Sequence, residues 1–264
     1  MEPSRTYTTS RIAAIAGVHP NTVRLYERIG FITAPQRRQN GYRVFTELHV
    51  LQVQLVRAAL DVELVHNGLR KEVLAIVDAM ARQSYDEALA LAEQRVVHLR
   101  RERAAAEDAL CHVRRLLALA PDDVAATAPA PAAAPAAPLM LTRQQTADYL
   151  DTTIDALRNW EMNGLLQVKR KQNGYRVYTA ADINRLAIIR ALRAANYSLA
   201  SILRLLEALD RDAATDIERV LDSPDPDDDI LSVCDRLLTS LDAAERNAFE
   251  MIALLERMKE IPST

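Results

Sequence analysis

The sequence predicts a mainly α-helical fold with two winged helix-turn-helix domains, each followed by a long coiled-coil helix. An internal repeat, a helix-turn-helix and hairpin pattern in each copy, and a heptad pattern after each copy support this fold. The stretch "QNGYRVFT" (39–46) recurs as "QNGYRVYT" (172–179), with seven of eight letters identical. Such repetition indicates a duplicated structural unit. The length of 264 residues also favours two domains.

The repeat extends well beyond this stretch. Residues 7–32 align with 141–166 at a shift of 134, and the shift becomes 133 after the following loop. The identical pairs include Thr8 and Thr142, Ala13 and Ala147, Arg24 and Arg158, Glu27 and Glu161, and Gly30 and Gly164. Both halves should therefore fold alike.

Each copy begins with two short helical patterns separated by a tight turn. Thr142 and Gln145 have the spacing of a capping box, and Pro20 suits the first position of a helix. Gly30 and Gly164 follow the second helical patterns, where a left-handed cap is expected. Helix, tight turn and helix together predict a helix-turn-helix.

A β-hairpin is predicted next in each copy. Asn-Gly followed by the alternating "YRVF" or "YRVY" is a strong hairpin signal. The tips are basic, reading "QRRQ" and "KRKQ", and Thr46 and Thr179 are positioned to cap a further helix. A generic turn and hairpin is the alternative, but it does not explain two basic tips. We therefore predict a wing in each copy.

Two long helices follow from the heptad spacing of apolar residues. The first predicted seam consists of Tyr85, Leu89, Ala92, Val96, Leu99, Arg103, Ala106, Leu110, Val113 and Leu117. The second consists of Cys234, Leu237, Leu241, Ala244, Ala248, Met251, Leu255 and Met258. Alternating three- and four-residue spacing is typical of coiled-coil helices.

The predicted domains follow from these patterns. They are a winged-helix domain (5–83), a long helix (84–120), a linker (121–138), a second winged-helix domain (139–210), and an acidic connector with a second long helix (211–264). The linker holds five prolines among 18 residues, mostly alanine otherwise, which is typical of a semi-rigid spacer. In the acidic stretch 222–229 a solvated connector is favoured over a calcium loop.

Charge and composition limit the function classes. Residues 1–60 carry a net charge of +5 and residues 139–200 carry +4, whereas residues 61–138 sum to −3 and residues 201–264 to −9. Two basic regions in an acidic chain indicate two anion-binding surfaces. Two cysteines and no apolar run of membrane length favour the cytoplasm. No Gly-rich phosphate loop, paired-carboxylate site or nucleophile pattern suggests an enzyme.

The stretch "TVRLYERIGFI…NGYRVFT" resembles the DNA-binding domain of the mercury-resistance-regulator (MerR) family of bacterial transcription factors. The second copy is similar, and Ser198 is placed to cap its fourth helix. The resemblance covers roughly 5–70 and 140–208. Three features depart from the family pattern: Val65 stands where that serine belongs in the first copy, Asn159 and Trp160 replace an aromatic pair, and Asp155 lies in the recognition helix.

The resemblance implies a set of DNA-binding residues. Arg24 and Arg158 would enter the major groove, Tyr26 and Trp160 would contact phosphate, and the wings would hold phosphates. The expected DNA-binding residues are Asn21, Thr22, Arg24, Tyr26, Arg37, Arg38, Tyr42, Arg43, Thr153, Asp155, Arg158, Trp160, Lys169, Arg170, Lys171, Tyr175 and Arg176. Phosphate contacts position a protein, whereas contacts to base edges specify a sequence.

The resemblance also implies a regulator that distorts an inverted-repeat promoter and allows RNA polymerase to engage. The long helices would pair antiparallel, so that one chain forms an intramolecular pseudo-dimer; a homodimer with four DNA-binding domains is the alternative. An architectural protein that bends or bridges nucleoid DNA is the rival function. No cofactor is expected. Cys111 and Cys234 could form a metal or redox site, but packing is favoured.

Overall fold

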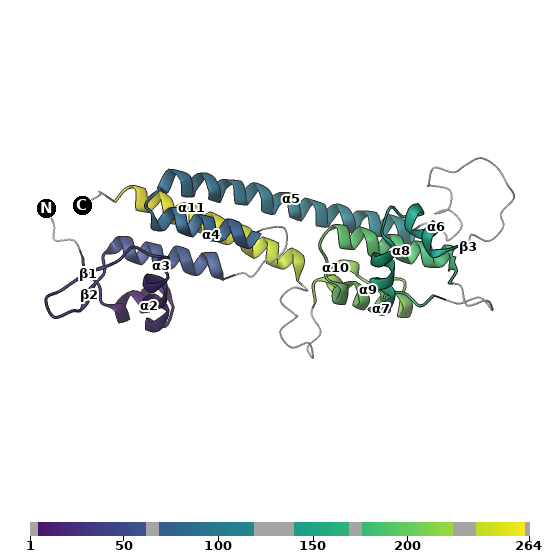
Figure 1. Ribbon diagram of the computed structural model, residues 1–264, viewed down its shortest axis with the longest axis horizontal. Helices are drawn as coiled ribbons and strands as arrows, with labels where there is room; N and C mark the ends of the chain where they lie inside the picture. Colours follow the sequence, from purple (N-terminus) through teal and green to yellow (C-terminus); the bar gives the residue numbers. More distant parts are fainter. Residues whose placement is uncertain (1–4, 62–68, 119–139, 169–175, 224–235, 262–264) are drawn as a thin grey trace. The chain divides into compact units, whose positions relative to one another are not determined.

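The computed structural model describes residues 5–61, 69–118, 140–168, 176–223 and 236–261 (Figure 1). The chain divides into two compact units, the first made of residues 1–101 with 240–264 and the second of residues 102–239. The predicted mainly α-helical fold is confirmed. Within the described ranges, no helix is both long enough and apolar enough to cross a membrane.

The first unit begins with the predicted helix-turn-helix. Helix α1 spans Thr9–Ala16 and helix α2 spans Pro20–Arg28. The hydroxyl of Thr8 caps α1 by accepting a hydrogen bond from the Arg11 N–H at 3.3 Å. Pro20 occupies the start of α2, and Gly30 just beyond its end has a φ of +78°, as predicted for a left-handed position.

The first wing is the predicted hairpin. Strand β1 (Gln36–Arg37) pairs antiparallel with β2 (Arg43–Val44), and Arg37 lies opposite Arg43. Gly41 has a φ of +81° in the turn between them. Because a side chain at this φ is strained, the Asn-Gly signal correctly marks the turn.

Three helices complete the N-terminal part of this unit. They are α3 (Glu47–Leu60), α4 (Leu69–Ala81) and α5 (Tyr85–Ala118), of which residues up to 101 belong here. Their buried residues form one core with those of α1 and α2. Side chains from the last helix, α11 (Leu237–Lys259), enter the same core at Met251, Leu254, Leu255 and Met258.

Helices α5 and α11 run antiparallel within the first unit. The Asp86 carboxylate near the start of α5 accepts a hydrogen bond from Lys259 Nζ at 2.5 Å, at the end of α11. Further along α5, Arg100 Nε donates to Glu245 Oε1 at 2.7 Å, and Glu245 lies nearer the start of α11. Both contacts join residues of one chain, and the pairing of the long helices as a pseudo-dimer stays a prediction.

The heptad pattern places the buried face of both long helices well. The second seam is buried at every described position: Leu237, Leu241, Ala244, Ala248, Met251, Leu255 and Met258. On α5 the seam residues from Ala92 to Val113 are buried apart from Arg103, which is half-buried. The prediction was wrong at Leu117, which is 41% exposed at the penultimate position of the helix.

The second unit repeats the arrangement with small changes. Its elements are β3 (Met140–Leu141), α6 (Arg143–Tyr149), α7 (Ile154–Met162), β4 (Tyr178–Thr179), α8 (Ala180–Ala194), α9 (Leu199–Arg211) and α10 (Ile217–Leu221). The capping box of Thr142 and Gln145 is present, and Ser198 caps α9 as predicted. The pairing of Leu141 with Tyr178 repeats that of Tyr7 with Phe45.

The C-terminal part of α5 belongs to this second unit. Ala106, Leu110 and Val113 are buried. Polar contacts hold the helix at both ends of this stretch: Asn196 Nδ2 donates to Glu102 Oε2 at 3.0 Å, and Arg114 Nη2 donates to Glu218 Oε1 at 2.6 Å. The linker 121–138 and the tip of the second wing lie outside the described residues.

Candidate nucleic-acid interface

Helix α2 presents a cationic face to solvent. Val23 and Tyr26 point into the core, while Asn21, Arg24 and Arg28 are exposed. Arg24 Nη1 donates a hydrogen bond to Asn21 Oδ1 at 2.8 Å, which aligns the two side chains and leaves the guanidinium with its full charge. The helix can therefore offer an amide and two guanidiniums to a polyanion.

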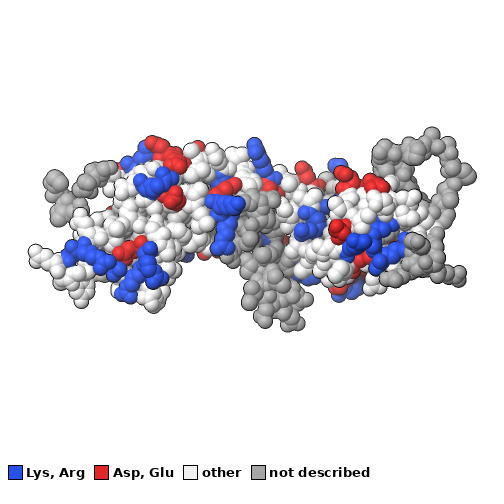
Figure 2. Space-filling model, in the orientation of Figure 1, with Lys and Arg blue, Asp and Glu red and all other residues white. Residues whose placement is uncertain are grey.

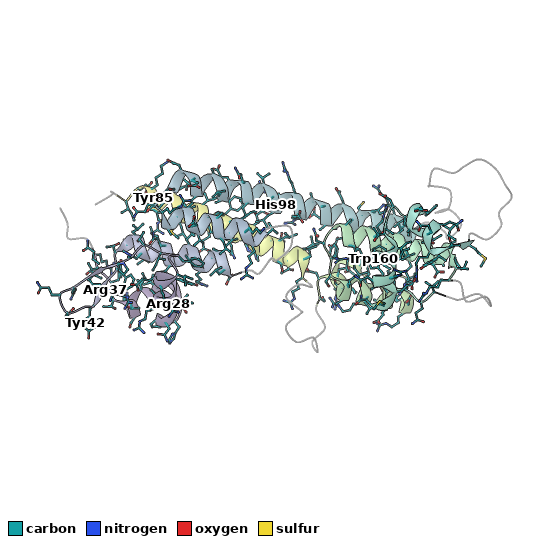
Figure 3. All side chains as sticks on the ribbon, in the orientation of Figure 1. Arg28, Arg37, Tyr42, Tyr85, His98 and Trp160 are labelled. Carbon is teal, nitrogen blue, oxygen red and sulfur yellow. The ribbon has the colours of Figure 1, made fainter. Side chains whose placement is uncertain are left out.

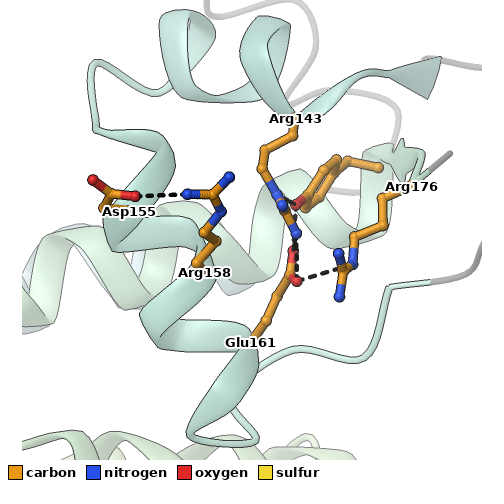
Figure 4. Close-up of polar contacts among 6 residues, drawn as sticks. Arg143, Asp155, Arg158, Glu161 and Arg176 are labelled. Carbon is orange, nitrogen blue, oxygen red and sulfur yellow. Dashed lines mark hydrogen bonds and ion pairs between the residues drawn. The ribbon is translucent and has the colours of Figure 1, made fainter.

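Helix α7 has a weaker cationic face. Arg158 Nη1 donates to Asp155 Oδ1 at 3.0 Å, so this arginine is paired with an acid three residues earlier (Figure 4). Met162 occupies the position equivalent to Arg28 and is 87% exposed. Thr153 acts as the N-cap by accepting a hydrogen bond from the Ala156 N–H at 3.0 Å. The two recognition helices therefore differ in charge more than their shared pattern suggests.

The predicted phosphate contacts Tyr26 and Trp160 are mostly buried. Their exposed fractions are 8% and 6%, and both belong to the buried side of their helices. Burial also raises the pKa of the Tyr26 hydroxyl. Little of either residue is accessible to a ligand, and their DNA contact stays a prediction.

The first wing adds charge beside α2. Arg37 and Arg38 are exposed, and Tyr42 at the turn is 73% exposed. Figure 2 shows arginine side chains gathered over the region of α2 and the hairpin in the first unit. Figure 3 shows Tyr42 and Arg37 on the hairpin, and Arg28 on the helix beside it. Recognition helix and wing thus form one cationic surface.

The wing arginine Arg43 is already engaged inside the protein. Its Nε donates to Glu27 Oε2 at 2.5 Å, and Arg37 Nη2 reaches Glu27 Oε1 at 3.4 Å. The Glu27 side chain is only 13% exposed. Both strands of the hairpin are therefore tied to the last turn of α2 by one carboxylate.

The second copy has the equivalent contact with additional donors (Figure 4). Arg176 Nε lies 3.0 Å from Glu161 Oε2, and Arg143 Nη2 donates to the same carboxylate at 2.7 and 3.0 Å. The Tyr178 hydroxyl also donates to Glu161. Burial and this hydrogen bond raise the pKa of Tyr178, so the phenol keeps its proton and stays a donor.

The repeat aligns Arg57 with Arg190, but the sequence reasoning assigned no role to this pair. Arg57 Nη1 donates to the carbonyl of Ala16 at 3.4 Å, and Arg190 Nη1 donates to that of Leu150 at 2.6 Å. Each reaches the C-terminal end of the first helix of its helix-turn-helix, where carbonyls lack intrahelical partners. The repeat aligns the two arginines, and this was the available signal.

The residues predicted for the second wing tip, Lys169, Arg170, Lys171 and Tyr175, lie outside the described residues, as does Cys234. Cys111 is a free and exposed thiol, so the expectation that it packs in the interior was wrong. It follows the seam residue Leu110 directly and therefore points off the buried stripe. In the described part of the chain, no cluster of three or more His, Cys, Asp or Glu has metal-binding geometry.

Two segments of the chain match profiles of one family. The profile described as MerR family regulatory protein matches residues 8–45, and that described as MerR HTH family regulatory protein matches residues 142–209. These segments contain the two helix-turn-helix motifs and most of the predicted site residues. No solved structure matches the chain significantly.

Curated relatives are named as regulators of the same kind. An uncharacterised HTH-type transcriptional regulator of Synechocystis sp. is 43% identical over 54 residues, covering 20% of this chain and 39% of the relative. The HTH-type transcriptional regulator CueR of Escherichia coli is 40% identical over 53 residues, with the same coverage of 20% and 39%. The mercuric resistance operon regulatory protein of Bacillus cereus is 30% identical over 83 residues, covering 30% of this chain and 62% of the relative.

The chain thus spans about two fifths to three fifths of the length of these relatives. Each half of the chain carries its own match to the family, on the segment where the helix-turn-helix lies. The chain is therefore similar to the MerR family in two places, with one MerR-type segment in each half of a single chain.

Proposed function

We propose that the protein is a DNA-binding transcriptional regulator that acts in the bacterial cytoplasm through two unlike winged-helix domains. The observation that supports this most directly is the position of Arg24, exposed on α2 beside a cationic hairpin. A helix that enters the major groove and a wing that follows the backbone need these charges in this arrangement.

Affinity would come from the backbone contacts. In the first domain Arg28, Arg37, Arg38 and Tyr42 are exposed around α2 and the hairpin. Each phosphate contact releases counterions and makes binding more sensitive to salt. In the second domain the basic residues 169–171 would make the equivalent phosphate contacts.

Sequence specificity would come from the recognition helices, which are not identical. Asn21 and Arg24 can offer donors and an acceptor to base edges, and Arg can bind guanine through two hydrogen bonds. Asp155 can accept from a cytosine amino group, but its charge opposes phosphate. The preferred site would therefore be an imperfect inverted repeat, with the first domain bound more strongly.

The regulatory step is proposed from the family. The relative from Bacillus cereus is named for regulating a mercuric resistance operon, so control of an operon promoter is the model for this chain. Distortion of the bound promoter would then let RNA polymerase engage. Such deformation takes free energy from the protein–DNA contacts and depends on the flexibility of the sequence.

Footprinting of the full chain on genomic DNA tests the proposal. A regulator should protect one or a few operators, each with two unlike halves about one or two helical turns apart. Weak, uniform protection would contradict it and favour the architectural alternative, in which cationic wings read DNA shape alone. The pairing of Arg158 with Asp155 is the observation that keeps this alternative open, because it reduces direct readout in the second domain.

A further inference from the structure

We infer that Glu27 and Glu161 fix each wing on its recognition helix, and that Arg43 and Arg176 serve DNA binding through this contact rather than by holding phosphate themselves. The inference rests on the proposed DNA-binding function. It assigns a positioning role to a glutamate that lies within a cationic surface. Considered by its charge alone, this glutamate would weaken DNA binding.

The geometry in the first domain carries the argument. Arg37 and Arg43 are opposite each other across the two strands of the hairpin, and both guanidiniums reach the carboxylate of Glu27. The carboxylate lies in the last turn of α2, three residues after Arg24. A shift of the wing relative to the recognition helix would therefore break both contacts at once.

Burial makes these contacts hard to exchange for DNA. The side chains of Glu27 and Glu161 are 13% and 9% exposed, while those of Arg43 and Arg176 are 28% and 35% exposed. A carboxylate so far removed from water needs its charged donors, and the loss of one partner is strongly unfavourable. Turning Arg43 toward a phosphate would leave Glu27 without its shortest hydrogen bond.

The second domain repeats the contact with other neighbours. Glu161 contacts Arg176, which precedes β4, and adds Arg143 from α6 and the hydroxyl of Tyr178. The first domain has Thr9 and Phe45 at the positions of Arg143 and Tyr178; Phe45 has no donor, and the contacts to Glu27 in the first domain come from Arg37 and Arg43. The contact shared by both copies is thus the one between the glutamate of the recognition helix and the equivalent arginine, Arg43 or Arg176.

Substitution of Glu27 by Gln separates positioning from charge. The change removes a negative charge near the DNA, so electrostatics alone predicts tighter binding. If Glu27 positions the wing, Glu27→Gln should instead weaken binding by roughly tenfold, the value of one charge-assisted hydrogen bond. Binding that is unchanged or tighter would overturn the inference.

The salt dependence of binding separates the roles of the arginines. The double variant Glu27→Gln with Arg43→Gln keeps the net charge, and we expect weaker binding with the wild-type salt slope. The matched control is Arg38→Gln on the same wing, where Arg38 is exposed and has no ion pair within the described residues. Loss of a phosphate contact there should flatten the slope of log K against log salt by about 0.9. An equal flattening in the double variant would assign Arg43 to phosphate and overturn the inference.

Hydrogen exchange of the free full-length protein gives a readout without DNA. The Arg38 N–H donates to the Tyr42 carbonyl at 2.9 Å across the hairpin, and its exchange should accelerate in Glu27→Gln. Amides of α4 in the same unit report on intact folding and should stay protected. A wing amide that exchanges at the wild-type rate would overturn the inference. If the wild-type chain bound no duplex DNA, the proposed function would be contradicted. The hydrogen-exchange experiment does not depend on that function, because it uses the protein without DNA.

Discussion

Asp155 accepts a hydrogen bond from Arg158 at 3.0 Å on the exposed side of α7. The equivalent pair on α2 is Asn21 and Arg24, joined at 2.8 Å in the same i, i+3 geometry. The two copies therefore keep the same contact and differ in charge. In the first, the partner of the arginine is a neutral amide; in the second, it is a carboxylate that is 87% exposed.

The first prediction concerns this difference. Asp155→Asn should increase the affinity of the chain for its operator by a few-fold, about 1 kcal/mol, because an exposed ion pair contributes little to folding while its acid repels phosphate. The reciprocal variant Asn21→Asp should weaken binding by roughly 1–3 kcal/mol, as expected when a good base contact is disturbed. Fluorescence anisotropy on the footprinted operator measures both.

A matched pair of half-sites provides the control. Because repulsion by phosphate does not depend on base sequence, the gain from Asp155→Asn should persist when the half-site facing the second domain is scrambled. The loss from Asn21→Asp should shrink when the half-site facing the first domain is scrambled, because a base contact is disturbed. An unchanged loss on that scrambled operator would show that α2 contributes charge without reading sequence.

The elements of the fold followed from local rules. The capping box of Thr142, the proline at the start of α2 and the glycine in the wing turn are each determined by a few neighbouring residues. Every described residue of the predicted seam of α11 is buried, because burial on a helix follows a fixed period, and Leu254 is buried beside the seam.

The orientation of long polar side chains could not be predicted this way. Arg43 and Glu27 are 16 positions apart, and a guanidinium at the surface of a hairpin can turn to solvent, DNA or a carboxylate. Only the packing of the wing on α2 selects the carboxylate. Similarly, Tyr26 and Trp160 lie in a helix whose periodicity allows an edge position, and the surrounding core decides that they are buried.

The second prediction concerns acid stability. His49 is 7% exposed, its Nδ1 accepts from the Thr46 N–H at 3.1 Å, and burial lowers its pKa below the usual 6.5. As the pH decreases below 6.5, His49 takes up a proton in the unfolded chain before it does so in the folded chain. The free energy of unfolding should therefore decrease as the pH decreases, until the pH is below the pKa of His49 in the folded chain. The loss is about 1.4 kcal/mol per unit of pKa depression. Urea denaturation at pH values from about 5 to about 8, the range in which histidines ordinarily titrate, measures this loss of stability.

The matched variant is His49→Gln, which keeps a side-chain acceptor at the third helical position and does not titrate. It should remove part of the acid sensitivity, whereas His112→Gln on the exposed side of α5 should leave it unchanged. If both variants retain the wild-type pH dependence, another group controls acid stability.

The third prediction concerns the cysteines. Cys111 is exposed, so it should react with a maleimide in the native protein, and Cys111→Ser should change stability and DNA affinity by less than about 0.5 kcal/mol. Together with Cys234→Ser it tests for a sensor. A folded double variant that loses a metal- or oxidant-dependent change in DNA binding would contradict the absence of a sensing role.

The last prediction concerns the number of chains in the functional particle. Asp86 meets Lys259 and Arg100 meets Glu245 within one chain, and α5 shares a core with α11 there. A linked partner is present at an effective concentration in the millimolar range, so that a second chain is not needed to cover this seam. We expect the full chain to sediment at 29.4 kDa, independent of concentration, as an intramolecular pseudo-dimer.

Charge reversal identifies which helices pair in solution. Asp86→Lys and Lys259→Asp should each destabilise the chain slightly, by less than about 1 kcal/mol, and combining both changes in one chain should restore stability. Mixing the two single variants should restore nothing, because the contact is made within each chain. A particle of twice the chain mass, together with recovery of stability on mixing, would show that α5 and α11 pair between chains, and the operator would then face four DNA-binding domains.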